Sequence, residues 1–210
     1  FKKILKPWDN VIDVGANQGF FTVLSSELIQ NGIVCSFEPE KNAFDRLTNN
    51  TKEKSNVRLI NAAVGDKEGE VDLYFNFDND SGHALWDIAA HHENPITRSH
   101  DRIIEKVKMV TLDSVIDFAP KLIKTDTEGC ELIVLKGAEN LLKQYKPLVV
   151  SEIHWMALEQ MGTSVKELYE YMLSIGYKTY SLPDEEEINL GESPKGKSVY
   201  NVVFKPIEGG

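Results

Sequence analysis

Short runs of aliphatic and β-branched residues alternate along the chain with segments whose apolar residues recur at helical spacing. The runs that fit the central strands of a sheet span residues 11–14, 33–37, 57–64, 122–127 and 147–154. Helices are expected between them, for example where Phe20, Val23, Leu24 and Leu28 share one face, and a further helix is expected from 129 through 142. This alternation is typical of βαβ units with parallel strands.

The middle and the end of the chain follow other patterns. Alternating apolar and polar residues predict a half-buried strand over 71–77 and a partner strand over 107–112. Residues 78–104 contain four of the five histidines and no long periodic face, so we expect a substrate-side insertion there. Two final strands, 177–182 and 199–205, are expected to form a hairpin. The pattern predicts a single doubly wound α/β domain over residues 1–210.

The composition narrows the class of protein. With 41% hydrophobic and 27% charged residues, the chain resembles an ordinary globular protein rather than a coiled coil or a disordered tail. Its 23 basic and 33 acidic side chains give a formal net charge of -10, so nucleic acid is not expected as a partner. No run approaches the ~20 apolar residues of a membrane helix, so no membrane span is expected.

The cysteine content favours a reducing, cytoplasmic location. The two cysteines, Cys35 and Cys130, are too few for a disulfide scaffold. They are expected to be free, because in the expected strand order 3-2-1-4-5 the first strand separates their strands by more than a disulfide can span.

The end of the first strand carries the first candidate chemistry. The loop from Asp13 to Gly19 contains turn-forming glycines, and Glu38 ends the second strand 19 residues after Gly19. An acidic residue at this distance reaches a ribose hydroxyl pair in dinucleotide-binding folds. However, Asn17 replaces the second glycine of the dinucleotide fingerprint, and Asp13 suits an ammonium better than a pyrophosphate. S-adenosylmethionine therefore fits better than NAD.

The fourth and fifth strands carry ionisable residues where buried strands are normally apolar. Period-two alternation predicts that Lys124, Asp126 and Glu128 share one side of the fourth strand, and that Glu152 and His154 share one side of the fifth. Buried ionisable groups are costly unless they are paired or face a ligand. Because both sets lie at the carboxyl ends of strands, we expect them to form one polar cluster at a functional site.

These motifs, taken in order and with their spacing, make the chain similar to the FkbM family of methyltransferases. The resemblance covers roughly residues 10–155 and rests on Asp13 to Gly19, Phe37-Glu38-Pro39, Thr111-Leu112-Asp113, Lys124-x-Asp126-x-Glu128-Gly129, Leu135-Lys136-Gly137-Ala138 and Ser151-Glu152-Ile153. It implies a Rossmann-like class I fold with a seven-stranded, mostly parallel sheet in the order 3-2-1-4-5-7-6 and helices on both faces. It also implies O-methylation of a hydroxyl on a sugar, polysaccharide or polyketide-like acceptor, with S-adenosylmethionine as donor and S-adenosylhomocysteine as product.

The resemblance assigns the loop after the first strand to the methionine end of the cofactor, Glu38 to the ribose and 61–63 to the adenine. The expected cofactor-binding residues are Asp13, Gly15, Ala16, Asn17, Gly19, Phe20, Thr22, Glu38, Pro39, Asn61, Ala62, Ala63 and Asp126. Ser81, His83 and Trp86 are expected to contact the acceptor, since an aromatic ring can stack on a sugar.

Methyl transfer needs one base to remove the acceptor's proton. The candidate catalytic residues are His154, Glu152, Glu128 and Lys124. The ordinary pKa of histidine favours His154, while Glu152 or Glu128 would serve if burial raised its pKa. A divalent cation held by Asp126, Glu128, Glu152 and His154 is an alternative, although we expect metal-free catalysis.

Two other functions use the same residues differently. A nicotinamide-dependent oxidoreductase would use Glu38 for NAD, and a non-catalytic nucleoside-binding module would bind the cofactor without turnover. Binding of S-adenosylhomocysteine against NAD distinguishes the first alternative, and methyl transfer distinguishes the second.

Overall fold

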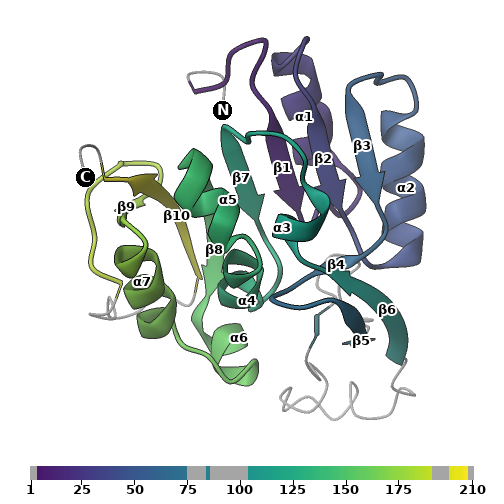
Figure 1. Cartoon of the computed structure of the whole chain (residues 1–210). Helices are drawn as coiled ribbons and strands as arrows, with labels where there is room; N and C mark the ends of the chain where they lie inside the picture. Colours follow the sequence, from purple (N-terminus) through teal and green to yellow (C-terminus); the bar gives the residue numbers. More distant parts are fainter. Residues whose placement is uncertain (1–3, 75–83, 86–103, 191–198, 208–210) are drawn as a thin grey trace.

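The computed structural model describes residues 4–74, 84–85, 104–190 and 199–207, which form a layered α/β fold (Figure 1). The main sheet has seven strands in the order β3-β2-β1-β7-β8-β10-β9. The strands are β1 (Val11–Val14), β2 (Val34–Phe37), β3 (Val57–Ile60), β7 (Leu122–Thr125), β8 (Leu148–His154), β9 (Tyr177–Ser181) and β10 (Val199–Pro206). Numbered within this sheet alone, the order is the predicted 3-2-1-4-5-7-6.

The central strands are parallel and covered on both faces. β1 pairs in parallel with β2 and β7, and β7 with β8, whereas β10 runs antiparallel to β8 and β9. Every residue of β1, β2 and β7 is buried, as expected for strands packed between two layers of helices.

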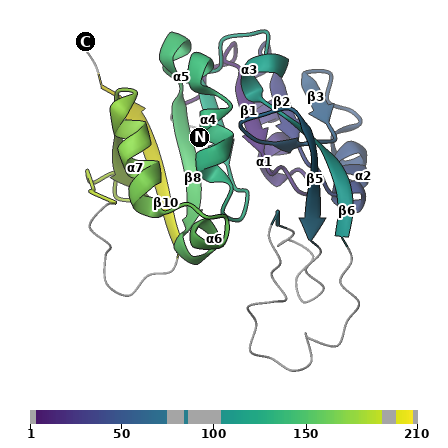
Figure 2. The ribbon, with the colours of Figure 1, turned by 60° about the horizontal axis from the view of Figure 1, so that its bottom comes forward.

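The helices form two contacting sets, which Figures 1 and 2 show on opposite faces of the sheet. One set is α1 (Phe20–Leu28) and α2 (Lys41–Thr51), and the other is α3 (Leu112–Val115), α4 (Glu131–Lys136), α5 (Glu139–Tyr145) and α7 (Val165–Ser174). The short helix α6 (Trp155–Gln160) follows β8. No helix in the described ranges is long and apolar enough to cross a membrane.

A second, three-stranded sheet corrects the predicted third strand. The run 57–64 is two strands, because β3 ends at Ile60 and β4 (Ala63–Val64) pairs with β6 (Ile104–Val110). Asn61 lies between the two strands, and its Nδ2 donates to the carbonyl oxygens of Glu38 and Pro39 over 2.8 Å and 3.0 Å. β5 (Gly69–Tyr74) pairs antiparallel with β6, which confirms the partnership predicted for the two middle strands.

The predicted helix over 129–142 is also divided, into α4 and α5. The break lies at Gly137, where an added Cβ would lie 1.9 Å from the carbonyl oxygen of Gly65. Asp113 fixes the second helix, since its carboxylate accepts the backbone amides of Asn140 and Leu141 at 3.0 Å each. Gly137 and Asp113 belong to the family motifs, and these contacts give both residues a structural role.

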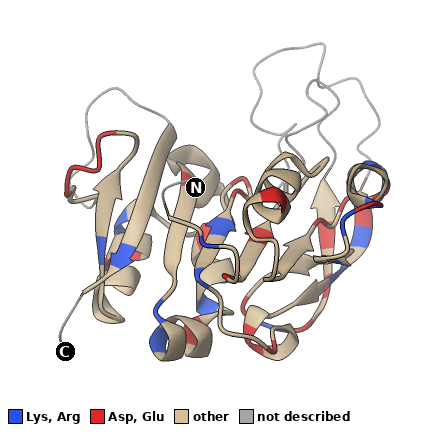
Figure 3. Ribbon diagram, turned by 90° about the horizontal axis from the view of Figure 1, so that it is seen from above, with Lys and Arg blue, Asp and Glu red and all other residues tan. Residues whose placement is uncertain are grey.

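One smaller prediction, on the cysteines, can be checked directly. Cys35 and Cys130 are free, as predicted, and both are buried, with Cys130 at the start of α4. The acidic loop 184–187, at the edge of the sheet near β9 (Figure 3), is an ion-paired surface segment. Lys178 Nζ lies 3.0 Å from Glu187, and Lys205 Nζ lies 2.5 Å from Glu185.

Candidate active site

A cavity of about 240 Å³ lies at the carboxyl ends of β1, β2, β7 and β8. This is the edge at which open α/β sheets bind ligands. Many of the residues expected at the site line it, namely Gly15, Asn17, Glu38, Pro39, Ala62, Ala63, Asp126, Glu128 and Glu152. The fold therefore gathers residues from four strands, far apart in sequence, around one space.

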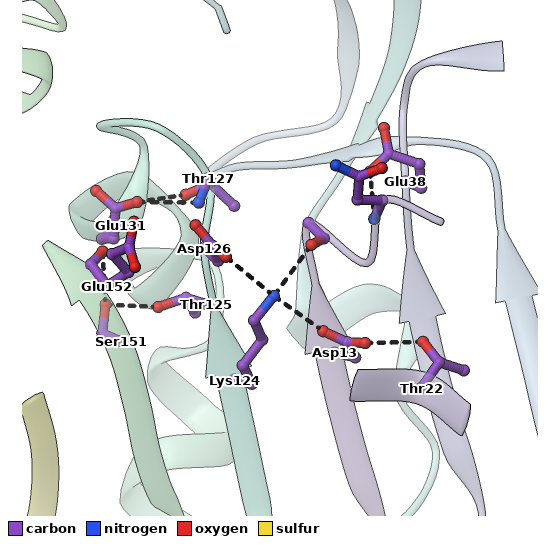
Figure 4. A network of polar contacts seen from close by, with 12 residues as sticks. Asp13, Thr22, Glu38, Lys124, Thr125, Asp126, Thr127, Glu131, Ser151 and Glu152 are labelled. Carbon is purple, nitrogen blue, oxygen red and sulfur yellow. Dashed lines mark hydrogen bonds and ion pairs between the residues drawn. The ribbon is translucent and has the colours of Figure 1, made fainter. Parts of the chain in front are cut away.

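Glu38, directly after β2, is held at the cavity by two backbone amides, one of which Figure 4 shows. The amide of Asn17 donates to Glu38 Oε2 over 2.8 Å, and the amide of Glu40 donates to Oε1 over 2.9 Å. The residue is only 7% exposed. Burial raises the pKa of Glu38 to about 7, although the two amide donors oppose the shift. A carboxylate oxygen can accept more than one hydrogen bond, so the Glu38 carboxylate can still bind a pair of hydroxyl groups.

Asp13 and Lys124 form a buried ion pair beside the cavity and do not line it. The two residues are direct neighbours across β1 and β7. Lys124 Nζ lies 3.4 Å from Asp13 Oδ1 and 3.4 Å from Asp126 Oδ2, and it donates to the Gly15 carbonyl over 3.1 Å. Thr22 Oγ1 donates to Asp13 Oδ2 over 2.7 Å. Burial of either charge alone would be costly, so each partner keeps the other in place.

The segment 126–129 corrects the predicted course of the fourth strand. β7 ends at Thr125, and Glu128 has a left-handed backbone with φ of 51°. The expected alternation of sides therefore stops at Thr125, because a turn and not a strand directs the following residues. The turn approaches the β1 loop so closely that a Cβ on Gly15 would lie 2.0 Å from the Asp126 carbonyl oxygen. Asp126 and Glu128 both line the cavity despite the different backbone.

Glu128 and Glu152 place two more carboxyl groups on the cavity wall. Burial, and then the nearby acidic groups Asp126, Glu131 and Glu152, raise the pKa of Glu128 to about 7. Burial and Asp126 likewise raise the pKa of Glu152, while Lys124 and His154 lower it. A carboxyl group with a pKa near neutrality can accept a proton from a substrate.

His154 lies near this group but does not line the cavity. Exposure alternates along β8, so Glu152 and His154 share a side of the strand as predicted. His154 is the N-cap of α6, and its Nδ1 accepts the backbone amide of Ala157 over 3.3 Å. One ring nitrogen is thus used to begin a helix, and the proposed role of His154 as base remains a prediction.

The other predicted residues surround the cavity or fall outside the described part. Asn61 supports the backbone of Glu38 and Pro39 from behind. The residues placed around the β1 loop that do not line the cavity are Ala16, Gly19, Phe20 and Thr22. Phe20 is 75% exposed. The three residues expected to contact the acceptor, Ser81, His83 and Trp86, lie outside the described residues.

Several cavity residues were not foreseen from the sequence. The apolar ones include Phe37, Leu73, Ala84 and Leu85, which β2 and the second sheet bring together. No local pattern signals such contacts, because they depend on the packing of two sheets. Glu131, which does not line the cavity, was not foreseen either. Its position at the start of an apolar helix, two residues after Gly129 of the motif, was a signal that it belongs to the site.

The lining favours a cationic over an anionic ligand. It contains the carboxyl groups of Glu38, Asp126, Glu128 and Glu152, and the described lining residues include no lysine, arginine or histidine. A pyrophosphate would be repelled here, whereas a sulfonium or an ammonium would be attracted. Within the described ranges, no group of three or more histidine, cysteine or acidic side chains is placed so that it could hold a metal ion.

Comparison with known proteins finds a methyltransferase among the similar sequences. The hexuronic acid methyltransferase AglP of Haloferax volcanii is 30% identical over 148 residues, which are 70% of this chain and 56% of that protein. The chain thus spans a little over half the length of this relative.

Solved structures share the fold. The methyltransferase FkbM from Methylobacillus flagellatus superposes with a TM-score of 0.58 at 18% identity, covering 95% of this chain and 44% of that one. A Streptococcus mutans structure in complex with S-adenosylhomocysteine superposes with a TM-score of 0.53 at 10% identity, covering 98% of this chain and 93% of that one. The model of the methyltransferase FkbM domain matches residues 13–179. The chain belongs to the FkbM methyltransferase domain family.

Proposed function

We propose that this chain is an S-adenosylmethionine-dependent O-methyltransferase that acts on a hydroxyl of a sugar or glycan. The observation that carries the proposal is Glu38, a buried carboxyl group held by two backbone amides at a cavity rich in acidic groups, in a chain of this family. The relative that modifies a hexuronic acid supports a sugar as acceptor. Residues 1–210 are proposed to act as one domain.

The cavity residues fit the proposed cofactor. Glu38 would accept hydrogen bonds from the two ribose hydroxyls. Asn17 Oδ1 is buried without a hydrogen-bond partner in the described structure, so it is a ready acceptor for the ammonium of the methionine end. Ala62 and Ala63, together with Phe37, provide an apolar wall for the adenine. When bound, the cofactor supplies a methyl group activated by a sulfonium.

Glu128 is the base that the geometry supports best. It lines the cavity, and the pKa raised to about 7 keeps much of it ionised at neutral pH while making it a stronger base than an exposed carboxylate. Its task would be to take the proton from the acceptor hydroxyl. Lys124 would act indirectly, because it anchors Asp126 and the Gly15 carbonyl, where the turn after β7 meets the β1 loop.

Calorimetric titration with S-adenosylhomocysteine and with NAD tests the cofactor. Transfer of a labelled methyl group from S-adenosylmethionine should then be measured to neutral hexosides, hexuronosides and a hydroxylated polyketide. We expect binding of S-adenosylhomocysteine, no binding of NAD and labelling of a sugar. Binding of NAD alone would overturn the proposal, and binding without transfer to any acceptor would favour a nucleoside-binding module.

A further inference from the structure

Glu131, the first residue of α4, makes contacts that the start of a helix does not require. Its Oε1 accepts three hydrogen bonds from the preceding turn, as Figure 4 shows in part. The donors are the Thr127 amide at 3.1 Å, the Thr127 hydroxyl at 2.9 Å and the Gly129 amide at 3.3 Å. The carboxylate therefore holds the backbone before the helix on both sides of Glu128.

The burial of Glu131 is energetically costly. The residue is 1% exposed, and its Oε2 is buried without a hydrogen-bond partner in the described structure. Burial raises the pKa of Glu131, because an ionised group removed from water loses much of its solvation, and the hydrogen bonds from Thr127 and Gly129 oppose this shift only in part.

The turn that Glu131 holds carries three lining residues of the cavity, Asp126, Thr127 and Glu128. Glu128 has a left-handed backbone, with φ of 51°. For a residue other than glycine this conformation costs about 1–2 kcal/mol, so the surroundings must impose it. Lys124 holds the Asp126 side of the turn, and Glu131 holds the Thr127 and Gly129 amides.

We propose that Glu131 is a positioning residue, which fixes the Thr127–Gly129 backbone and thereby directs the Glu128 carboxylate into the cavity. This inference rests on the proposed function for the role of Glu128 as base. Its geometric part, the hold on the turn, does not depend on catalysis.

The test uses the whole chain with Glu131→Asp, which withdraws the carboxylate by one methylene, and Glu131→Gln, which keeps an oxygen in place. Glu139→Asp is the matched control, because Glu139 is a half-buried glutamate in the first turn of α5 whose side chain is 44% exposed. We expect Glu131→Asp to lower kcat by ~10²-fold, since a displacement of about 1 Å can cost that much. The KM for the acceptor and the Kd for S-adenosylhomocysteine should change by less than about threefold. The kcat of Glu131→Gln should lie between those of the wild type and Glu131→Asp.

Two further measurements separate positioning from general stability. In the Glu128→Gln background, Glu131→Asp should cause little additional loss of kcat, because residues that act as a unit are not additive. Amide hydrogen exchange at Thr127 and Gly129 should be ~10-fold faster in Glu131→Asp and unchanged in Glu139→Asp. Thr127→Val removes only the hydroxyl donor and gives a milder version of the same effect.

Each outcome decides the inference. Unchanged exchange in Glu131→Asp would overturn it, even if the wild type methylated no acceptor in the panel. Faster exchange with full kcat, or a loss of kcat that adds to that of Glu128→Gln, would also overturn it. Failure of the wild type to bind S-adenosylhomocysteine would overturn the proposed function, while exchange would still decide whether Glu131 holds the turn.

Discussion

Protonation of Glu38 should make cofactor binding depend on pH. The carboxylate can accept hydrogen bonds from both ribose hydroxyls only when it is ionised, and burial raises the pKa of Glu38 to about 7 in the ligand-free chain. Binding therefore favours loss of the proton. Because the raised pKa leaves the group protonated below pH 7, affinity should increase as the pH rises through 7.

The magnitude follows from the fraction of ionised Glu38. One pH unit below its pKa about 1 in 11 groups is ionised, and one unit above about 10 in 11 are. Apparent affinity scales with the competent fraction, so S-adenosylhomocysteine should bind ~10-fold more tightly at pH 8 than at pH 6, or about 1.4 kcal/mol. About half a proton should be released per ligand bound at pH 7.

Calorimetry in buffers of different ionisation enthalpy measures both quantities. In Glu38→Gln the pH dependence should disappear. Affinity at pH 8 should fall roughly tenfold or more, because the side-chain NH2 of glutamine would face one of the two backbone amides that anchor Glu38. Glu128→Gln is the control, since the pKa of Glu128 is also raised to about 7 at the same cavity. It should keep the pH dependence. A flat profile in the wild type, or a slope that persists in Glu38→Gln, would refute the reasoning.

Other predictions concern catalysis, packing and the thiols. Glu128→Gln should lower kcat by ~10²–10⁴-fold with little change in the Kd for S-adenosylhomocysteine, and full activity in initial-rate assays would assign the proton to another group. Gly137→Ala should lower the free energy of unfolding by about 1–3 kcal/mol or more in urea titrations, because the new Cβ would lie 1.9 Å from the Gly65 carbonyl oxygen. Unchanged stability would mean that this backbone contact can yield. Both buried cysteines should resist a thiol reagent in the folded chain and react after unfolding without reductant, and fewer than two free thiols would contradict the structure.

Several features of the site were accessible from the sequence because they depend on local pattern and on the rules of parallel sheets. Glu38 was found from its distance to the β1 loop, and Asp126, Glu128 and Glu152 were found as ionisable residues at strand ends. The structure brings all four to one cavity. The carboxyl ends of parallel strands share one edge of a sheet, so strand order alone was enough to predict that these side chains meet.

The roles of individual residues were less accessible, since a role depends on partners from distant parts of the chain. The sequence indicated Asp13 as a ligand for an ammonium group. In the structure, its carboxylate forms an ion pair with Lys124 and accepts a hydrogen bond from Thr22. Gly137 and Asp113 belong to the family motif, yet their contacts brace α5 and the second sheet. A motif marks residues that matter without distinguishing those that bind from those that support.

The sequence by itself indicated most strands of the main sheet and the acidic character of the edge where the cavity lies, because hydrophobic periodicity and residue types at strand ends are properties of short segments. The order of the strands was implied by the resemblance of the motifs to those of the family, and the structure has the same order. Only the tertiary structure decided that the run 57–64 divides between two sheets, that β7 gives way to a turn at Thr125 and that Glu131 holds this turn. The reason is physical: such features arise where hydrogen bonds and close backbone contacts between distant segments outweigh the local preference to continue a strand or a helix.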